Sequence, residues 1–157
     1  MRSRCERSGV KSLVSRLEQF RGYIDQGLPE RAAPFTRWLN GTILAVERGS
    51  ITMRWVVREE AINAAGILHG GIQSAMLDEA MGMAVATLDH PEFHITIDLN
   101  VTFLGRARLG DTVTGTGRVI REGKRVVYCE GELLDTKGKL MARASSSLIG
   151  PPERRTP

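Results

Sequence analysis

Residues 63–71 read Asn-Ala-Ala-Gly-Ile-Leu-His-Gly-Gly and lead directly into an apolar segment, residues 72–88, which carries Asp78. That segment is apolar on nearly every face, a pattern typical of a helix enclosed by the rest of the protein. A carboxylate in such a helix costs free energy unless it is paired or used. The glycine pair at the helix start also offers backbone N–H groups to an anion. With the side chains of Asn63 and His69, these groups point to an acyl-transfer site.

The composition fits one folded domain that needs neither a metal nor a disulfide to hold its core. The chain has 157 residues, enough to bury a sizeable apolar interior. Its two cysteines, Cys5 and Cys129, are too few for a disulfide framework. We therefore expect a reducing compartment and a cytoplasmic protein. No run of residues is long and apolar enough to span a bilayer, so no membrane partner is expected.

The charge of the chain is concentrated near its start. The sequence holds 22 basic and 18 acidic residues, a net charge of +4. Residues 1–21 account for six of the basic and two of the acidic residues, so the rest of the chain carries 16 of each. Because the body of the protein is neutral, we expect no nucleic-acid partner.

Three parts follow one another along the chain. We expect a basic helical leader in residues 1–30, a folded domain in residues 31–150 and a disordered tail in residues 151–157. Within the leader, apolar residues at helical spacing predict a helix over residues 10–23, ended by the glycine and proline that follow. The leader has no uninterrupted apolar stretch of the kind that a secretory signal needs.

The rest of the chain reads as strands. Two of them form a hairpin across residues 47–50, and the segment after the apolar helix alternates apolar and polar residues with a strict period of two. In that segment we expect the apolar face to join the core. Glycines inside the later strands predict a sheet that bends sharply. The predicted strands are residues 42–46, 51–57, 95–103, 112–120, 125–134 and 140–149.

A long apolar helix followed by antiparallel strands must be wrapped by them, because one sheet face is the only apolar partner available. The expected fold class is therefore α+β, with a sheet curled around a central helix. Asp78 follows Gly70 by eight residues, which places the two roughly 12 Å apart along one helix. One substrate carbonyl cannot touch both in the same chain. If they cooperate, they come from two subunits related by a two-fold axis, which predicts a dimer with two shared sites.

The sequence resembles a known family over about residues 35–149. The shared motif is Asn63, then Gly66-Ile67-Leu68-His69-Gly70-Gly71, then Leu77-Asp78, and it is similar to that of hotdog-fold acyl-CoA thioesterases of the phenylacetate-pathway (PaaI) type. The segment 96–103 is similar to the strand that follows the central helix in that family. The resemblance implies a hotdog thioesterase domain in residues 31–150, acting on a fatty or aromatic acyl-CoA in a homodimer or a dimer of dimers (a homotetramer). It also implies no metal and no cofactor, because coenzyme A is part of the substrate.

The resemblance also assigns roles at the matching positions. Asp78 matches the catalytic carboxylate, which acts on water as general base or attacks the thioester as nucleophile; both mechanisms remain open here. Gly70 matches the residue whose backbone N–H polarises the thioester carbonyl, and Asn63 the residue that orients water or the leaving group. His69 matches the motif histidine that holds the loop and Asn63 in place. Thr96 falls where members carry a hydroxyl that hydrogen-bonds near the carboxylate or its water.

Binding of coenzyme A requires basic side chains for its phosphates. Arg106 and Arg108 follow the alternating strand, and Lys124 and Arg125 lie at the next hairpin turn, so these four are candidates by charge and position. Gly71, at the start of the helix, is a further candidate for substrate binding. The competing interpretation is that the basic residues form solvated faces.

Other residues have competing interpretations too. Asp78 could pair or cap across a subunit interface instead of acting in catalysis. Glu79 points roughly 100° away around the helix, so we expect a structural or solvent-facing side chain. His90 and His94, with Asp89, have a spacing that a metal could use, but they straddle a proline-containing loop without a fourth ligand. We therefore predict no metal site.

Two other functions share the predicted fold. The first is a non-catalytic acyl-CoA binder or sensor, against which the retained Asp78 and Asn63 argue. The second is a different hotdog enzyme, such as a thioesterase acting on acyl-carrier protein or a dehydratase. Dehydratases of this fold pair a histidine with an acidic residue in other motifs, which this sequence lacks. The choice between coenzyme A and a carrier protein stays open, as does the length of the acyl chain.

Overall fold

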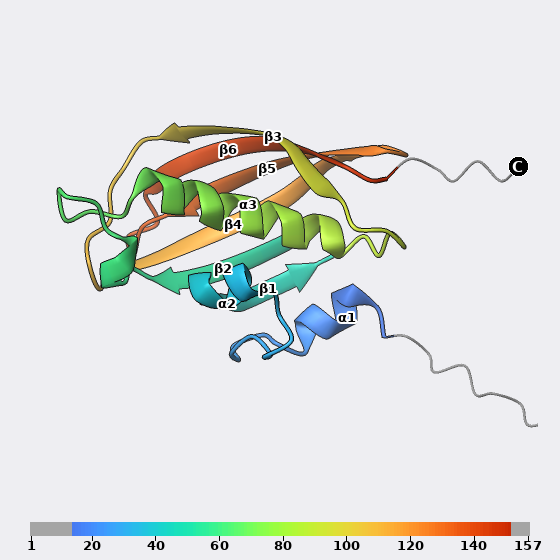
Figure 1. The fold of residues 1–157 in the computed structure, drawn as a ribbon, viewed down its shortest axis with the longest axis horizontal. Coiled ribbons are helices and arrows are strands. Elements are labelled where there is room, and N and C mark those ends of the chain that lie inside the picture. Colours follow the sequence, from blue (N-terminus) through green and yellow to red (C-terminus); the bar gives the residue numbers. More distant parts are fainter. Residues whose placement is uncertain (1–13, 152–157) are drawn as a thin grey trace, which may run out of the picture.

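The computed structural model describes residues 14–151, and in it one antiparallel sheet curls around a long helix (Figure 1). This helix, α3, spans Gly70–Ala86. The six strands lie in the order β1-β2-β4-β5-β6-β3, so β1 and β3 form the two edges of the sheet. The predicted α+β hotdog architecture is confirmed. The strands are β1 Thr42–Glu47, β2 Ser50–Val56, β3 Ile95–Phe103, β4 Thr112–Glu122, β5 Val126–Leu134 and β6 Leu140–Ile149.

The predicted element boundaries are close to the observed ones. All six expected strands are present, with ends that differ from the predicted ones by at most two residues. The central helix begins two residues earlier than expected, at Gly70, because His69 caps its first turn. Within residues 14–151, no helix has both the length and the apolar content needed to cross a membrane.

Two short helices precede the sheet, and a 3₁₀ turn lies between β2 and α3. They are α1 Arg16–Arg21, α2 Pro34–Leu39 and the turn Glu59–Ala61. The predicted N-terminal helix, residues 10–23, is therefore found in part: the helix begins at Arg16 after its N-cap Ser15 and ends at Arg21. Residues 10–13 of the prediction lie outside the described residues, as does most of the predicted tail. Nothing in the sequence predicted α2 or the 3₁₀ turn, because elements this short show no periodic pattern.

The central helix lies very close to the middle of the sheet. A Cβ atom placed on Gly117 of β4 would lie 2.4 Å from the carbonyl oxygen of Ala80 and 2.6 Å from the backbone nitrogen of Met81. On Gly131 of β5, a Cβ atom would lie 3.1 Å from the side chain of Leu77. The strand glycines, interpreted from sequence as bends, thus let the backbone of α3 approach the backbone of the sheet.

The strand β3 differs from expectation in what its apolar face contacts. Leu99 and Val101 are half-buried against the core, but Ile95, Ile97 and Phe103 are 59%, 54% and 48% exposed. The prediction that this whole face joins the core was therefore wrong for one protomer. The reason is the position of β3 at the sheet edge, where it pairs only with β6 and is distorted by a bulge between Thr96 and Asp98.

Candidate active site

The loop before α3 is ordered by Asn63. Its side-chain oxygen Oδ1 accepts hydrogen bonds from the backbone N–H of Ala65 at 2.9 Å and of Ile67 at 3.4 Å. Its own backbone N–H donates to the carbonyl of Ile67 at 2.9 Å. The turn also requires a positive φ of 70° at Gly66. Asn63 therefore holds this loop itself, and the amide nitrogen of its half-buried side chain makes no hydrogen bond to residues 14–151.

The first turn of α3 is capped by His69. Its ring nitrogen Nδ1 accepts the backbone N–H of Gly71 at 2.9 Å, and its carbonyl accepts those of Ile72 and Gln73. The N–H of Gly70 donates no hydrogen bond to any residue in 14–151. Gly70 therefore presents the free donor at the helix start, where backbone N–H groups stabilise negative charge. Gly71, predicted to bind substrate, uses its N–H within the cap.

The capping interaction makes a testable contribution to stability. His69→Ala is expected to lower the free energy of unfolding by about 1 kcal/mol, the usual value of a helix N-cap side chain. Thermal unfolding would detect a fall in Tm of about 2–4 °C. The control is His69→Asn, because asparagine supplies a capping oxygen and is expected to restore much of the loss. Equal stability of His69→Ala and the wild type would contradict the capping role.

Asp78 lies in the middle of α3 and meets Thr96 of β3. The Thr96 hydroxyl donates a hydrogen bond of 2.8 Å to Asp78 Oδ1. Asp78 is half-buried, more accessible than the buried carboxylate expected from the apolar sequence around it. Its second oxygen has no hydrogen-bond partner among residues 14–151. The structure thus brings Asp78 and Thr96 together and leaves a carboxylate oxygen free to act on a proton or a carbon atom.

Gly70 and Asp78 are not brought together within one protomer. Both belong to the regular helix α3, eight residues apart, which separates them by roughly 12 Å. Asn63 and His69 lie at the Gly70 end of the helix. The chain therefore carries two separate groups of candidate residues, one around Asp78 and one around the helix start.

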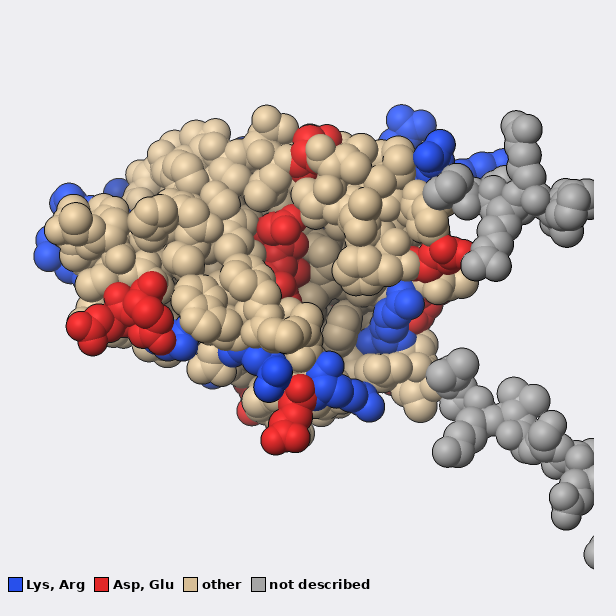
Figure 2. Space-filling model, viewed as in Figure 1, with Lys and Arg blue, Asp and Glu red and all other residues tan. Residues whose placement is uncertain are grey.

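A cavity of about 360 Å³ opens beside Asp78. Its wall is largely apolar and combines residues from α1, α2, α3, the loop after α3, β3 and β6. Figure 2 shows acidic side chains in a hollow in the middle of this face, surrounded by uncharged residues. The main apolar residues of the wall are Phe20, Met83, Phe93, Ile95 and Leu148. An apolar cavity next to a carboxylate suits a ligand with one apolar part and one reactive group.

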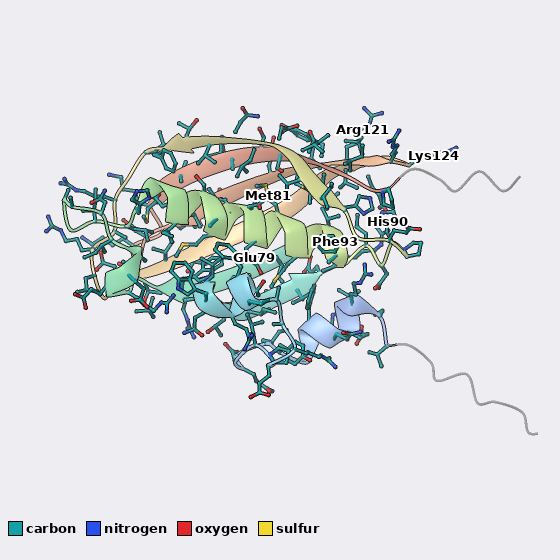
Figure 3. All side chains as sticks on the ribbon, viewed as in Figure 1. Glu79, Met81, His90, Phe93, Arg121 and Lys124 are labelled. Carbon is teal, nitrogen blue, oxygen red and sulfur yellow. The ribbon has the colours of Figure 1, made fainter. Side chains whose placement is uncertain are left out.

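Glu79, which was expected to be structural or solvent-facing, lines the same cavity. Figure 3 shows it on the side of α3 that faces α2, and its side chain is half-buried. Burial raises the pKa of the Glu79 carboxyl; a hydrogen bond with the Thr36 side chain opposes this rise, and the charge of Asp78 adds to it. No local pattern predicts that Thr36 and Glu79 lie together, because Thr36 precedes Glu79 by more than forty residues.

The predicted basic residues separate into two groups. Lys124 and Arg125 lie at the β4–β5 turn, near the C-terminal end of α3, where Figure 3 shows Lys124 close to the end that carries His90. Arg106 and Arg108 follow β3 at the other end of the helix. The two basic groups lie at opposite ends of α3, which is about 25 Å long. A ligand bound at Asp78 of one chain therefore cannot contact both groups of that chain.

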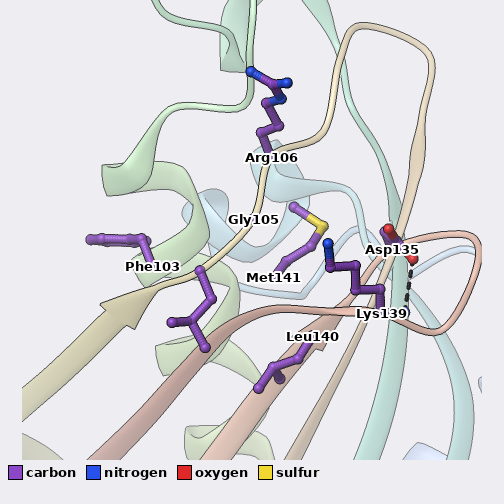
Figure 4. A pocket seen from close by; sticks show the side chains of 8 residues that line it. Phe103, Gly105, Arg106, Asp135, Lys139, Leu140 and Met141 are labelled. Carbon is purple, nitrogen blue, oxygen red and sulfur yellow. Dashed lines mark hydrogen bonds between the residues drawn. The ribbon is translucent and has the colours of Figure 1, made fainter.

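Arg106 belongs to a second cavity, of about 380 Å³, near the start of α3 (Figure 4). Phe103 lines this cavity, and its ring would lie 3.4 Å from a Cβ atom on Gly70. Lys139 lines the cavity from the β5–β6 turn, which is held by Asp135 accepting the backbone N–H of Lys139 at 2.9 Å. Lys139 was not predicted, because in the sequence it reads only as part of a turn.

The residues considered for a metal have other partners. The Asp89 carboxylate accepts the backbone N–H of Arg16 at 2.6 Å, and His90 Nε2 lies 3.1 Å from Glu122. The His94 ring lies 4.9 Å from that of His90, and burial lowers the His94 pKa. In residues 14–151 no three His, Cys, Asp or Glu side chains are grouped to hold a metal ion.

A cysteine nucleophile does not fit this site. Cys129, on β5, is fully buried, and burial raises its thiol pKa to about 12. A thiol with that pKa stays protonated near neutral pH, and only the thiolate is a strong nucleophile. Cys129 therefore supplies no nucleophile near neutral pH.

Comparison with known proteins agrees with this geometry. The family model described as the thioesterase superfamily matches residues 65–142. A protein named as an esterase from Sulfurisphaera tokodaii is 34% identical over 122 residues, which cover 78% of this chain and 90% of the relative. Acyl-coenzyme A thioesterase 13 from Homo sapiens is 29% identical over 103 residues, covering 65% of this chain and 74% of the relative.

Solved structures extend the comparison to the whole fold. The phenylacetic acid degradation-related protein from Ralstonia eutropha superimposes with a TM-score of 0.72 at 32% identity, covering 87% of this chain and 99% of that one. The Escherichia coli PaaI protein superimposes with a TM-score of 0.71 at 20% identity, covering 77% and 86%, and so supports the fold alone. With its matching motif, helix and strand order, this chain belongs to the thioesterase superfamily and adopts the hotdog fold.

Proposed function

We propose that the protein is an acyl-CoA thioesterase that hydrolyses a thioester to the free acid and coenzyme A. The observation that carries this proposal is the Thr96–Asp78 hydrogen bond at the mouth of an apolar cavity. A carboxylate held by a hydroxyl beside an acyl-sized space suits attack on an acyl group. Membership of the thioesterase superfamily and the likeness to human acyl-coenzyme A thioesterase 13 support the same reaction.

In the proposed reaction, Asp78 acts on the carbonyl carbon of the thioester, either directly or through a water molecule. As a general base it takes a proton from water, which then attacks the carbon; as a nucleophile it forms an anhydride that water hydrolyses. In both cases the carbonyl oxygen becomes an oxyanion and the C–S bond breaks. The free N–H of Gly70 stabilises that oxyanion, an interaction worth ~2.7–4 kcal/mol in other enzymes. Asn63 orients water or the leaving thiolate with its unpaired amide nitrogen.

The proposed site is shared between two subunits. Asp78 cannot meet Gly70 of its own chain, so Gly70 and Asn63 of the partner subunit complete the site. The free edge of β3 supports this arrangement, because an unpaired strand edge is a template for pairing with another chain. Ile95, Ile97 and Phe103 on that strand are left exposed in one protomer and suit burial in such an interface.

Coenzyme A carries phosphates that basic side chains recognise. In the proposed complex, Arg106 contacts them near the start of α3, where Lys139 supplies a second cation in the same cavity. Arg108 lies beside Arg106. Lys124 and Arg125 lie at the far end of α3 in one protomer, so they serve this role only if they belong to the partner subunit.

Thiol release from a panel of short, long and aromatic acyl-CoAs tests the reaction. We expect turnover of at least part of the panel, measured with a thiol reagent and confirmed by detection of the free acid. Matched acyl-carrier-protein thioesters distinguish the two possible acyl donors. Tight binding of acyl-CoAs without hydrolysis of any thioester would contradict the proposal and favour a sensor.

Solution mass tests the shared site. We expect a particle of at least twice the 17.3 kDa of one chain, measured by light scattering at the protein concentration of the activity assay. A stable monomer with full activity would contradict the assignment of Gly70 and Asn63 to the partner subunit.

A further inference from the structure

Gly82 is a glycine that neither the packing nor the backbone of the described chain requires. It lies in the interior of α3, and its φ is not positive. A Cβ atom on Gly82 would meet no heavy atom of residues 14–151 within 4 Å, apart from the backbone of its own turn. Gly117 is the opposite case, because a Cβ atom there would meet the backbone of Ala80. Since glycine inside a helix is less stable than alanine, the missing side chain of Gly82 needs another explanation.

The side of α3 that carries Gly82 faces the cavity beside Asp78. Residues four apart lie on the same side of a helix, so Asp78, Gly82 and Ala86 follow one another along it. All three line the cavity of about 360 Å³. The space that a side chain at Gly82 would fill therefore belongs to this cavity.

The cavity narrows at the C-terminal half of α3, where Figure 3 shows Phe93 and His90. An adjoining hollow of about 10 Å³ has room for roughly one water molecule. Its wall includes three polar residues, of which Arg16 donates a hydrogen bond of 3.0 Å to the backbone carbonyl of His90. An apolar chain end is unfavourable beside such groups. The residues that line both spaces are Gly82, Ala86, Phe93 and His94, and the three polar residues of the hollow alone are Arg16, His90 and Glu92.

We infer that Gly82 determines the length of the acyl group, because it leaves room for an unbranched chain that lies along α3 from Asp78 to Ala86. This inference rests on the proposed function and names straight-chain acyl groups of medium length as its substrate class. The helical rise places Gly82 roughly 6 Å and Ala86 roughly 12 Å beyond Asp78. An extended chain covers these distances with about five and about ten carbon–carbon bonds. With the thioester carbonyl at Asp78, the sixth carbon of the chain lies at Gly82.

The wild type should therefore show an optimum of chain length. A cavity of about 150 Å³ holds a benzene ring, so 360 Å³ suffices for a medium-length chain. Each methylene buried in the cavity should raise kcat/KM about fourfold. We expect kcat/KM to rise from butanoyl-CoA to octanoyl-CoA and to fall at tetradecanoyl-CoA, whose end would have to enter the polar hollow. Equal kcat/KM for these three substrates would overturn the inference.

Gly82→Ala should change stability and specificity in opposite directions. Loss of the helix-interior glycine should raise Tm by about 2–4 °C, measured by thermal unfolding at one fixed protein concentration. The added methyl group should lower the ratio of kcat/KM for octanoyl-CoA to that for butanoyl-CoA about fourfold, the effect of one lost methylene contact. A fall in Tm or in solution mass would show that another part of the protein or a second chain fills this space, which would overturn the inference.

Gly82→Leu should have the larger effect on specificity. Its side chain blocks the path of the last three carbons of octanoyl-CoA, so the same ratio should fall by roughly 50-fold. The control is Gly27→Leu, because Gly27 is exposed and a Cβ atom there would also meet nothing within 4 Å. That variant should keep the wild-type ratio. An unchanged ratio in Gly82→Leu would contradict the role of Gly82.

A binding measurement separates this inference from the proposed function. Thioether analogues of butanoyl-CoA and octanoyl-CoA cannot be hydrolysed, so their Kd values report recognition alone. We expect the wild type to bind the octanoyl analogue more tightly, and Gly82→Leu to lose that preference, even if no thioester is hydrolysed. Absence of turnover contradicts the proposed reaction, and a preference that Gly82→Leu retains contradicts the inference.

Discussion

Asp78→Asn is expected to lower kcat for thioester hydrolysis by about 10²–10⁴-fold, the usual contribution of a general base. Asparagine has nearly the same shape, and its amide oxygen can still accept the hydroxyl of Thr96, which is 2.8 Å from Asp78 in the wild type. The variant loses the ability to take a proton or to form an anhydride. Its Kd for a thioether analogue should therefore stay within a few-fold of the wild-type value. Thiol-release assays measure kcat, and titration calorimetry measures the Kd of the thioether analogue.

The matched control for this experiment is Asp98→Asn. Asp98 lies two residues from Thr96 on β3, and its carboxylate accepts the backbone N–H of Ser147 at 3.2 Å on the exposed side of the strand. The same change of charge there should leave kcat within about twofold, since surface substitutions usually have small effects. Unchanged turnover in Asp78→Asn would show that another carboxylate acts, and Glu79 would be the next candidate because it lines the same cavity.

Gly117→Ala should be the most destabilising small substitution in the sheet. The added Cβ atom would lie 2.4 Å from the carbonyl oxygen of Ala80, so the backbone of α3 and the backbone of β4 would have to separate. Overpacking of a core usually lowers the free energy of unfolding by about 1–3 kcal/mol. We expect about 3 kcal/mol here, because the clash is between two backbones. We expect a fall in Tm of about 10 °C, measured by thermal unfolding at one fixed protein concentration.

Gly131→Ala provides the comparison for that substitution. Its Cβ atom would meet the side chain of Leu77 at 3.1 Å and that of Met81 at 3.3 Å, and both side chains can move. The loss of stability should be about 1 kcal/mol. If both alanine variants unfold at the same temperature, the distance between α3 and β4 is not the tight constraint that the structure indicates.

Local patterns in the sequence were sufficient to predict most of the fold. Alternation, turn glycines and the long apolar run placed all six strands and α3 to within two residues. The packing of β3 was the exception. Alternation identified its apolar face correctly, but it did not predict which residues of that face are buried. Ile95 and Ile97 are 59% and 54% exposed, because β3 lies at the edge of the sheet. A pattern of apolar residues identifies one face of a strand, and it contains no information on whether a neighbouring element of the chain covers that face.

The candidate site was predictable only where its residues belong to a motif. Of the residues in the motif and the following strand, the structure brings Asp78 and Thr96 to 2.8 Å from each other and keeps Gly70 with His69 at the start of α3. The surroundings of Glu79 were not predictable, because they include Thr36 of α2, a six-residue helix without a recognisable pattern. Contacts between distant segments depend on packing, which no local pattern encodes.

The close approach at Gly117 also means that the shape of the cavity beside Asp78 can change without a change in the position of α3 on the sheet. One wall of the cavity is formed by α3. The distance of α3 from the sheet is fixed by the contact between its backbone and the backbone of β4 at Gly117. The opposite wall contains Phe20, Ala33 and Thr36, which come from a segment outside the sheet. Mutations in that segment can therefore change the shape of the cavity while the helix that carries Asp78 keeps its position on the sheet. The fold thus places part of the cavity wall on a segment whose change leaves the contact between α3 and the sheet intact.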